Sequence, residues 1–305
     1  QLVAFIEYLF HAMFSLMLFS NVFVMYPKAQ VSAERIEEVL TSETIIKDPV
    51  QGVTETNNEG TLVFNDVTFT YPDGEEPVIK NVSFKAKKGE TIAFIGSTGS
   101  GKSTLINLIP RFYDVTGGSI KIDGIDVRDF KIKSLRQKIG FIRQKTLLFT
   151  GSIKSNIKFG KQEASHDEVV ESAKTAQAYD FISKKELKFD EPIGEGGSNV
   201  SGGQKQRLSI ARALVRKPEI YIFDDSFSAL DFKTDAILRA ELKKETADAI
   251  VLIVAQRIGS IMEADKIIVL DEGKVVGCGK HKELLKSCSV YKEIALSQLT
   301  EEELA

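Results

Sequence analysis

The sequence is poor in the residues that build disulfide frameworks and metal cages. Its 305 residues include two cysteines, Cys278 and Cys288, and three histidines, His11, His166 and His281. Two cysteines cannot form a framework of several disulfides, and their spacing of ten residues fits no zinc-ligand pattern. We therefore expect unpaired thiols, a reducing compartment, and surface positions for His166 and His281.

An excess of basic residues is also missing. Lysine and arginine number 40 against 43 aspartates and glutamates, which gives a formal net charge of -3. A nucleic-acid surface needs a concentrated basic patch, so a nucleic-acid partner is not expected. What the sequence does have is 43% hydrophobic and 27% charged residues, the composition of a folded chain about two domains long.

The longest apolar run covers residues 2–26 and is long enough, as a helix, to cross a bilayer. A signal peptide is the alternative, but the run lacks a basic leader and a small-residue cleavage site, and Lys28 and Arg35 follow it. These basic residues place whatever follows the span on the cytoplasmic side. We expect residues 1–40 to form a transmembrane helix and its cytoplasmic extension in the inner (plasma) membrane, with the lipid bilayer as one partner.

A few polar residues interrupt the apolar run. At roughly 100° per residue, Glu7, His11 and Asn21 fall on one helix stripe about 80° wide. A charge that faces lipid is costly, so the stripe should face either a water-filled cavity or the polar groups of other helices. Both readings stay open. A single span cannot form a pore, and the chain begins with Gln1, so we expect further spans upstream in a longer protein.

The remainder of the chain alternates strand and helix patterns after a linker. Residues 41–60 lose helical periodicity and collect proline, glycine and asparagine. From 61 to about 300 the patterning is α/β, except that strand signals stop over about 145–216, which predicts a helical subdomain. Asp123-Gly124 and Glu272-Gly273 predict hairpin turns, so part of the sheet is antiparallel. The predicted strands are 62–69, 78–84, 91–95, 139–142, 220–223, 250–254 and 267–270.

A glycine-rich segment joins the predicted strand 91–95 to a helical run. Residues 96–103 fit G-x-x-x-x-G-K-[ST], the pattern of a phosphate-binding P-loop. Its glycines let backbone N–H groups point at phosphate oxygens, and the helix N-terminus adds its positive dipole end. Lys102 would hold the β and γ phosphates, and Ser103 would ligate Mg²⁺. The predicted nucleotide-binding residues are Gly96, Ser97, Thr98, Gly99, Ser100, Gly101, Lys102, Ser103 and Thr104.

A second motif is a hydrophobic strand, residues 219–223, that ends in the two carboxylates Asp224 and Asp225. In a P-loop protein the aspartate at such a strand end normally holds the metal, directly or through water. We therefore predict that Asp224 joins Ser103 at the Mg²⁺ ion.

A third motif points to a family. Residues 200–204 read Val-Ser-Gly-Gly-Gln and open a helical run, and they resemble the signature of ABC ATPases, usually Leu-Ser-Gly-Gly-Gln. The resemblance implies ATP as the ligand, and the fused apolar span is similar to the last membrane helix of an ABC exporter half-transporter. The fold class expected is therefore α/β, an ABC-type ATPase domain with a mixed-sheet core and a helical subdomain, preceded by one transmembrane helix. The resemblance covers nearly all of 61–296, in the family's order: Tyr71, the P-loop, Gln144, the signature, Asp224, residues 228–231 and Gln256.

The resemblance implies a role for each matching residue. Tyr71 would stack on adenine, and Gln144 would reach Mg²⁺ and the attacking water. Asp231 would contact the partner domain or cap its own loop. In this family two ATPase domains sandwich two ATP molecules head to tail, so each signature completes the other chain's site. The signature of this chain would contact the partner's ATP through Ser201, Gly202, Gly203 and Gln204.

Two positions depart from the family pattern. Members that hydrolyse ATP well carry a glutamate after the Mg²⁺-binding aspartate and a histidine at the switch position, where this chain has Asp225 and Gln256. Aspartate retracts the carboxylate by one methylene, and a misplacement of that size can cost about a hundredfold in rate. Glutamine can donate to the γ-phosphate but carries no positive charge. We expect Asp225, Gln256 and Gln144 to form the catalytic set of a degenerate site that binds Mg-ATP and hydrolyses it slowly.

An intact signature beside a weakened site predicts a heterodimer. The chain would be the degenerate-site subunit of a bacterial multidrug-type ABC exporter, and a different half-transporter would supply the glutamate and histidine. A slow homodimer and a purely regulatory nucleotide-binding module stay open, whereas the fused span argues against an importer or a soluble ABC protein. Drug, lipid and peptide are all open as the transported substrate, and multidrug export is favoured by family analogy alone.

Overall fold

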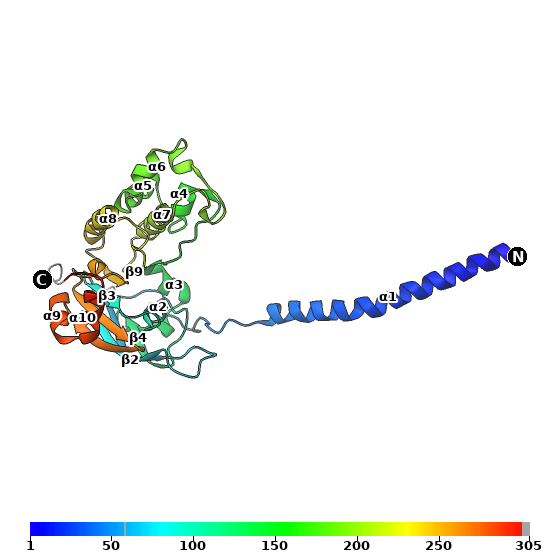
Figure 1. The fold of residues 1–305 in the computed structure, drawn as a ribbon, viewed down its shortest axis with the longest axis horizontal. Coiled ribbons are helices and arrows are strands. Elements are labelled where there is room, and N and C mark those ends of the chain that lie inside the picture. The colour runs from blue at the N-terminus through cyan, green and yellow to red at the C-terminus, as the bar shows by residue number, and fades with distance from the viewer. Residues whose placement is uncertain (58, 301–305) are drawn as a thin grey trace. The chain divides into compact units, whose positions relative to one another are not determined.

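The computed structural model describes residues 1–57 and 59–300 and divides the chain into two compact units, residues 1–47 and the chain from Asp48 onward. The first unit is dominated by one helix, α1 (Leu2–Thr41), drawn in blue in Figure 1. No residue of α1 is buried, and an 18-residue window within it has a mean hydropathy of 1.9. By length and composition α1 is a candidate membrane span, as the apolar run predicted.

The second unit is built on a six-stranded sheet with the order β12-β11-β3-β10-β9-β6. All neighbours pair in parallel except β12, which pairs antiparallel with β11. The inner strands are runs of buried β-branched and aromatic residues, as expected when both faces of a parallel sheet are covered. The strands are β3 (Thr91–Ile95), β6 (Ile139–Ile142), β9 (Ile220–Asp224), β10 (Ile250–Val254), β11 (Lys266–Asp271) and β12 (Lys274–Gly279).

A second sheet of four antiparallel strands has the order β2-β1-β4-β5. Its strands are β1 (Thr61–Phe69), β2 (Ile79–Lys87), β4 (Gly117–Ile122) and β5 (Ile125–Asp126). Both predicted hairpins are confirmed, because β4 pairs with β5 across Asp123-Gly124 and β11 pairs with β12 across Glu272-Gly273. The predicted mixed α/β core is therefore correct.

Helices fill the stretch where strand signals stop, and Figure 1 shows α4 to α8 gathered together in green and yellow. Two short strands that the sequence did not predict, β7 (Gly151–Ser152) and β8 (Pro192–Ile193), also lie there. The helices of this unit are α2 (Lys102–Asn107), α3 (Ile132–Gln137), α4 (Ile153–Lys158), α5 (His166–Thr175), α6 (Tyr179–Ser183), α7 (Gly202–Leu214), α8 (Phe232–Glu245), α9 (His281–Ser287) and α10 (Ser289–Leu296). Short 3-10 turns are η1 (Val127–Asp129), η2 (Lys188–Asp190), η3 (Glu195–Gly197) and η4 (Ile258–Ser260).

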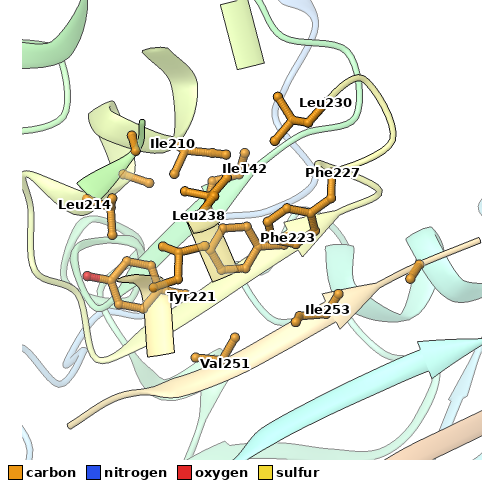
Figure 2. Packing of buried hydrophobic residues seen from close by; sticks show 14 of the residues in the cluster. Ile142, Ile210, Leu214, Tyr221, Phe223, Phe227, Leu230, Leu238, Val251 and Ile253 are labelled. Carbon is orange, nitrogen blue, oxygen red and sulfur yellow. The ribbon is translucent and has the colours of Figure 1, made fainter. Parts of the chain in front are cut away.

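One hydrophobic cluster fixes the end of β9. Figure 2 shows Tyr221 and Phe223 of β9 against Ile210 and Leu214 of α7, with Phe227 beyond the strand end. The rings of Phe223 and Phe227 stack with centroids 5.1 Å apart. These two residues flank the carboxylates at positions 224 and 225, so the core holds both sides of the segment that carries them.

Part of the predicted linker belongs to the second unit and docks on the rest of it. We call residues 48–56 the docked segment. The Val53 N–H donates to the Asp129 carbonyl, and the Val53 carbonyl accepts from the Lys131 N–H, both at 2.9 Å. Asp48 Oδ1 accepts from the first N–H of α3 at 2.7 Å and so caps that helix. The docked segment is thus held by main-chain bonds of the kind found in a sheet.

The expected surface position of His281 is wrong. Only 5% of His281 is exposed, and its Nδ1 lies 2.7 Å from the hydroxyl of Tyr291. The cause is the packing of α9 against α10, which covers the ring. His166 is exposed as expected, and both cysteines are free thiols, Cys278 exposed and Cys288 buried.

Candidate nucleotide-binding site

The P-loop lies between β3 and α2, and its backbone requires glycine at specific positions. Gly101 precedes α2 with φ +96°, a left-handed conformation, and a Cβ there would lie 2.7 Å from Cδ1 of Ile79. A Cβ on Gly96 would lie 2.0 Å from the Leu270 carbonyl oxygen. Both glycines are therefore needed for the tight path of the loop. This path brings the loop's main chain round the side chain of Lys102.

The Lys102 ammonium is held inside the P-loop. Its Nζ donates to the carbonyls of Gly96 and Ser97, both at 2.7 Å, and to Oγ of Ser100 at 3.2 Å. Burial lowers the pKa of Lys102, while the carboxylates of Asp225 and Asp224 oppose that shift. An ammonium with three donors, sitting in a loop of main-chain groups, suits phosphate oxygens.

Ser103 and Asp224 meet at the mouth of the loop. Ser103 Oγ donates to Asp224 Oδ1 at 3.1 Å, although the two residues lie on different elements. Burial is the largest influence on Asp224 and raises its pKa, which the hydrogen bond from Ser103 and the charges of Arg143 and Lys102 oppose. A hydroxyl and a carboxylate are the hard oxygen ligands that Mg²⁺ prefers. The pair fits a Mg²⁺ ion shared with the phosphates of a nucleotide.

Asp225 lies next to this pair and is held by two glutamines. Gln144 Nε2 donates to Asp225 Oδ2 at 2.9 Å, and Gln256 Nε2 donates to the same oxygen at 2.8 Å. Burial raises the pKa of Asp225, the bond from Gln144 lowers it, and the neighbouring charge of Asp224 raises it. The backbone of Asp225 is left-handed, with φ 46°, and its N–H donates to the carbonyl of Val254 at 2.9 Å. All three residues predicted to be catalytic thus meet at one carboxylate oxygen.

Tyr71 is brought to the first turn of the P-loop helix. Its hydroxyl lies 3.0 Å from Oγ1 of Thr104, and its ring meets Phe69 and Tyr113 edge-on, at 4.8 and 5.2 Å. Tyr71 is half-buried, so part of its ring is left accessible beside the loop. Stacking on adenine stays a prediction.

The signature residues form the start of α7. Ser201 Oγ accepts from the Gln204 N–H at 3.3 Å, and Gln204 Oε1 accepts from the Ser201 N–H at 3.0 Å, which is a capping box. A Cβ on Gly202 would meet nothing within 4 Å, so open space lies there. Among the described residues, the hydrogen bonds of the Ser201 and Gln204 side chains stay within 201–204 and do not reach Lys102, Ser103 or Asp224. The structure therefore brings together Lys102, Ser103, Gln144, Asp224, Asp225 and Gln256, but not the signature.

Several residues near the site were not anticipated from the sequence. Buried Gln206 on α7 accepts from Thr146 Oγ1 and donates to the Arg143 carbonyl, so it ties the signature helix to the Gln144 loop. Gln298, beyond α10, bonds the main chain at Gln256 and Ile258. Contacts between distant parts of the chain leave no recognisable motif in the sequence.

Asp231, for which two roles were open, caps α8 by accepting from the Thr234 N–H at 2.9 Å.

The site combines a P-loop with an aspartate, Asp224, that ends a strand and bonds the P-loop serine, Ser103. Polar side chains converge on the neighbouring Asp225. This combination defines a P-loop nucleotide-binding domain. Residues 79–228 match the family model described as ABC transporter. A solved bacterial Atm1-family ABC exporter with ATP bound has the same fold, with a TM-score of 0.83 and 32% identity over 90% of this chain and 48% of that one. This chain carries the ATP-binding domain of an ABC transporter.

Curated relatives match most of this chain. An uncharacterized ABC transporter ATP-binding protein of Mycobacterium tuberculosis is 42% identical over 307 residues, which cover 98% of this chain and 52% of the relative. The YfiB protein of Bacillus subtilis, named in the same way, is 43% identical over 302 residues, covering 99% and 52%. A putative multidrug export ATP-binding/permease protein of Staphylococcus aureus is 46% identical over 236 residues, covering 77% and 41%. The chain spans about half the length of these relatives.

Proposed function

We propose that this chain is a subunit of an ATP-driven, multidrug-type membrane exporter, in which it binds Mg-ATP at a weakly catalytic site. Residues 1–40 would form the last membrane helix and its extension, 41–60 the connection, and 61–300 the ATPase domain on the cytoplasmic side, with a helical subdomain at about 145–216. The names of the multidrug export relative and of the solved exporter support this assignment.

Binding of Mg-ATP rests on the P-loop geometry. Lys102 would exchange its loop carbonyls for phosphate oxygens, and Ser103 and Asp224 would hold the Mg²⁺ ion. Bound Mg²⁺ would neutralise charge that develops on the phosphates. Tyr71, held beside the first turn of α2, would cover the adenine.

The observation that carries the weak-catalysis proposal is the position of Asp225. Its shorter side chain ends where two amide donors, Gln144 and Gln256, converge on one oxygen. A base in this state must give up donated hydrogen bonds before that oxygen can take a proton from water, which lowers its reactivity. Gln256 brings no positive charge that could compensate.

The signature would serve a second chain. Ser201 starts a helix of 13 residues, and the open space at Gly202 leaves its N-terminus accessible to an anion. We propose that this end of α7 completes the ATP site of a partner half-transporter that carries the missing glutamate and histidine. A homodimer with two slow sites, or a chain that uses ATP only as a regulatory clamp, would share the binding residues and differ in turnover.

The test is steady-state ATP turnover by the purified complete assembly, with wild-type chain and with Asp225→Ala. A change of less than about twofold is expected, because the partner's site carries the hydrolysis. Near-total loss would make Asp225 a working catalytic carboxylate and overturn the proposal. Lys102→Ala serves as the control that removes ATP binding at this site, and an active assembly made of this chain alone would favour the homodimer.

A further inference from the structure

The turn that follows α10 holds the backbone of the segment that carries Gln256. Gln298 Nε2 donates to the Gln256 carbonyl at 2.7 Å, and Gln298 Oε1 accepts from the Ile258 N–H at 2.9 Å. One side-chain amide thus makes two main-chain bonds of opposite direction, which fixes its orientation. Gln298 is itself placed by its N–H, which donates to the Ala295 carbonyl at the end of α10 at 3.1 Å.

The segment that Gln298 holds is also anchored at its two ends. Ala255 is buried, and its N–H donates to the Phe94 carbonyl of β3 at 3.1 Å, while Ile258 is completely buried. Gln256 between them is exposed. Because an exposed residue gains little from packing, the direction of its side chain depends on how its main chain is held. Gln298 supplies that hold at the carbonyl of Gln256.

A continuous series of hydrogen bonds leads from the C-terminal region to the nucleotide site. Gln298 bonds the Gln256 main chain, the Gln256 side chain donates to Asp225 Oδ2, and Gln144 donates to the same oxygen. We propose that Gln298 is a positioning residue, which aims Gln256 at the nucleotide site and thereby sets how long this chain retains bound ATP. The inference rests on the proposed function, since it concerns the same site.

The experiment follows ATP retention by this chain within the complete assembly in lipid nanodiscs. The assembly is loaded with a photoreactive ATP analogue and Mg²⁺, chased with unlabelled ATP, and cross-linked at intervals, and the two subunits are separated on a gel. For Gln298→Ala we expect the label on this chain to be lost about tenfold faster, the factor that corresponds to about 1.4 kcal/mol. The melting temperature should stay close to that of the wild type, since the side chain is exposed.

Two further variants separate positioning from a general structural role. Gln298→Glu keeps an acceptor for the Ile258 N–H but cannot donate to the Gln256 carbonyl, so its label loss should be at least as fast as that of Gln298→Ala. In a Gln256→Ala background, Gln298→Ala should change retention by less than about twofold, because the side chain that it positions is gone. Ser297→Ala is the matched control, since the Ser297 hydroxyl donates to the Ile294 carbonyl within its own turn, at 2.7 Å.

Different results would contradict either the positioning role of Gln298 or the binding of ATP at this site. Unchanged retention in Gln298→Ala, or full additivity of Gln298→Ala and Gln256→Ala, would overturn the positioning role while leaving the proposed function intact. A wild-type chain that retained no more label than Lys102→Ala would overturn ATP binding at this site, and the positioning role with it.

Discussion

At the scale of single residues, the proposed weak catalysis depends on two positions, and at one of them, Asp225, the side chain is one methylene shorter than the glutamate of the family pattern. The structure places the Asp225 carboxylate between two amide donors, and the flanking residues Phe223 and Phe227 are fixed in the core. Because this packing holds the backbone on both sides of Asp225, we expect side-chain length to set how far its carboxylate reaches toward a bound nucleotide.

Restoring that length should raise turnover at this site. With the partner's own P-loop inactivated, so that only this site can hydrolyse ATP, we expect Asp225→Glu combined with Gln256→His to increase turnover by about 10- to 100-fold. Phosphate release by the complete assembly measures it. Asp225→Asn is the matched control and should give no gain. Equal turnover rates for the wild type and the Asp225→Glu, Gln256→His double variant would mean that another step limits hydrolysis.

At the scale of elements, the pairing of α9 with α10 buries the side chain of His281. Burial lowers the pKa of His281, with a smaller contribution from the charge of Lys282, and Nε2 has no hydrogen-bond partner among the described residues. The folded state therefore binds a proton less readily than the unfolded state. The contribution of neutral His281 to the free energy of unfolding is therefore fully present above the pKa of the unfolded state, about 6.5. It is lost as the pH falls toward the lower pKa of the folded state.

The pH dependence of unfolding tests this burial. Between about pH 6.5 and 5 the wild-type melting temperature should fall with pH, and His281→Phe, which cannot take a proton, should flatten that fall. His166→Gln removes an exposed histidine and should leave the slope unchanged. Parallel curves for the wild type and His281→Phe would contradict the assignment.

Arg212 is the main polar contact between α7 and the α4 region. It donates to the Asn156 carbonyl and Oδ1 at 2.8 and 2.9 Å and to the Leu147 carbonyl at 3.0 Å, and it lies over the rings of Phe149 and Phe159. Lysine cannot reproduce this planar arrangement of donors. We expect Arg212→Lys to lower the free energy of unfolding by about 1–3 kcal/mol, as measured by urea denaturation. Lys243→Ala, an exposed change on α8, should stay within about 0.5 kcal/mol.

The features predicted correctly from the sequence are those that a short, contiguous stretch of residues encodes. The bounds of β3, β6 and β10 agree with the predicted strands, because short β-branched runs are typical of buried parallel strands. The two strands β7 and β8 were missed, since two residues carry no periodicity and the pair forms only when distant parts of the chain meet. The P-loop and strand-end aspartates were recognisable as contiguous motifs. Gln298 was not, because a side chain that bonds main-chain groups 40 and 42 residues away leaves no pattern.

At the scale of the whole molecule, the contacts of the docked segment predict that the ATPase domain folds as a unit from Asp48 rather than from Thr61. Besides the bonds at Asp48 and Val53, Thr56 Oγ1 donates to Asp123 Oδ2 at 2.7 Å. A fragment that starts at Thr61 loses these contacts and the cap of α3. We expect its free energy of unfolding to be about 1–3 kcal/mol below that of a fragment starting at Asp48, as measured by urea denaturation. A third fragment that starts at residue 42 should match the Asp48 fragment, and equal stability of all three would show that docking contributes nothing.

The contacts of the docked segment would also set the point at which tension in the chain from α1 reaches the ATPase domain. Tension in the chain arriving from α1 meets its first anchors at Asp48 and Val53, and these transfer it to α3 and the residues before it, ahead of β1. From α3 the chain continues into β6, which ends two residues before Gln144. Under the proposed function, we expect a pull on α1 to reach the strand that leads to Gln144, whose amide bonds Asp225, before it reaches β1.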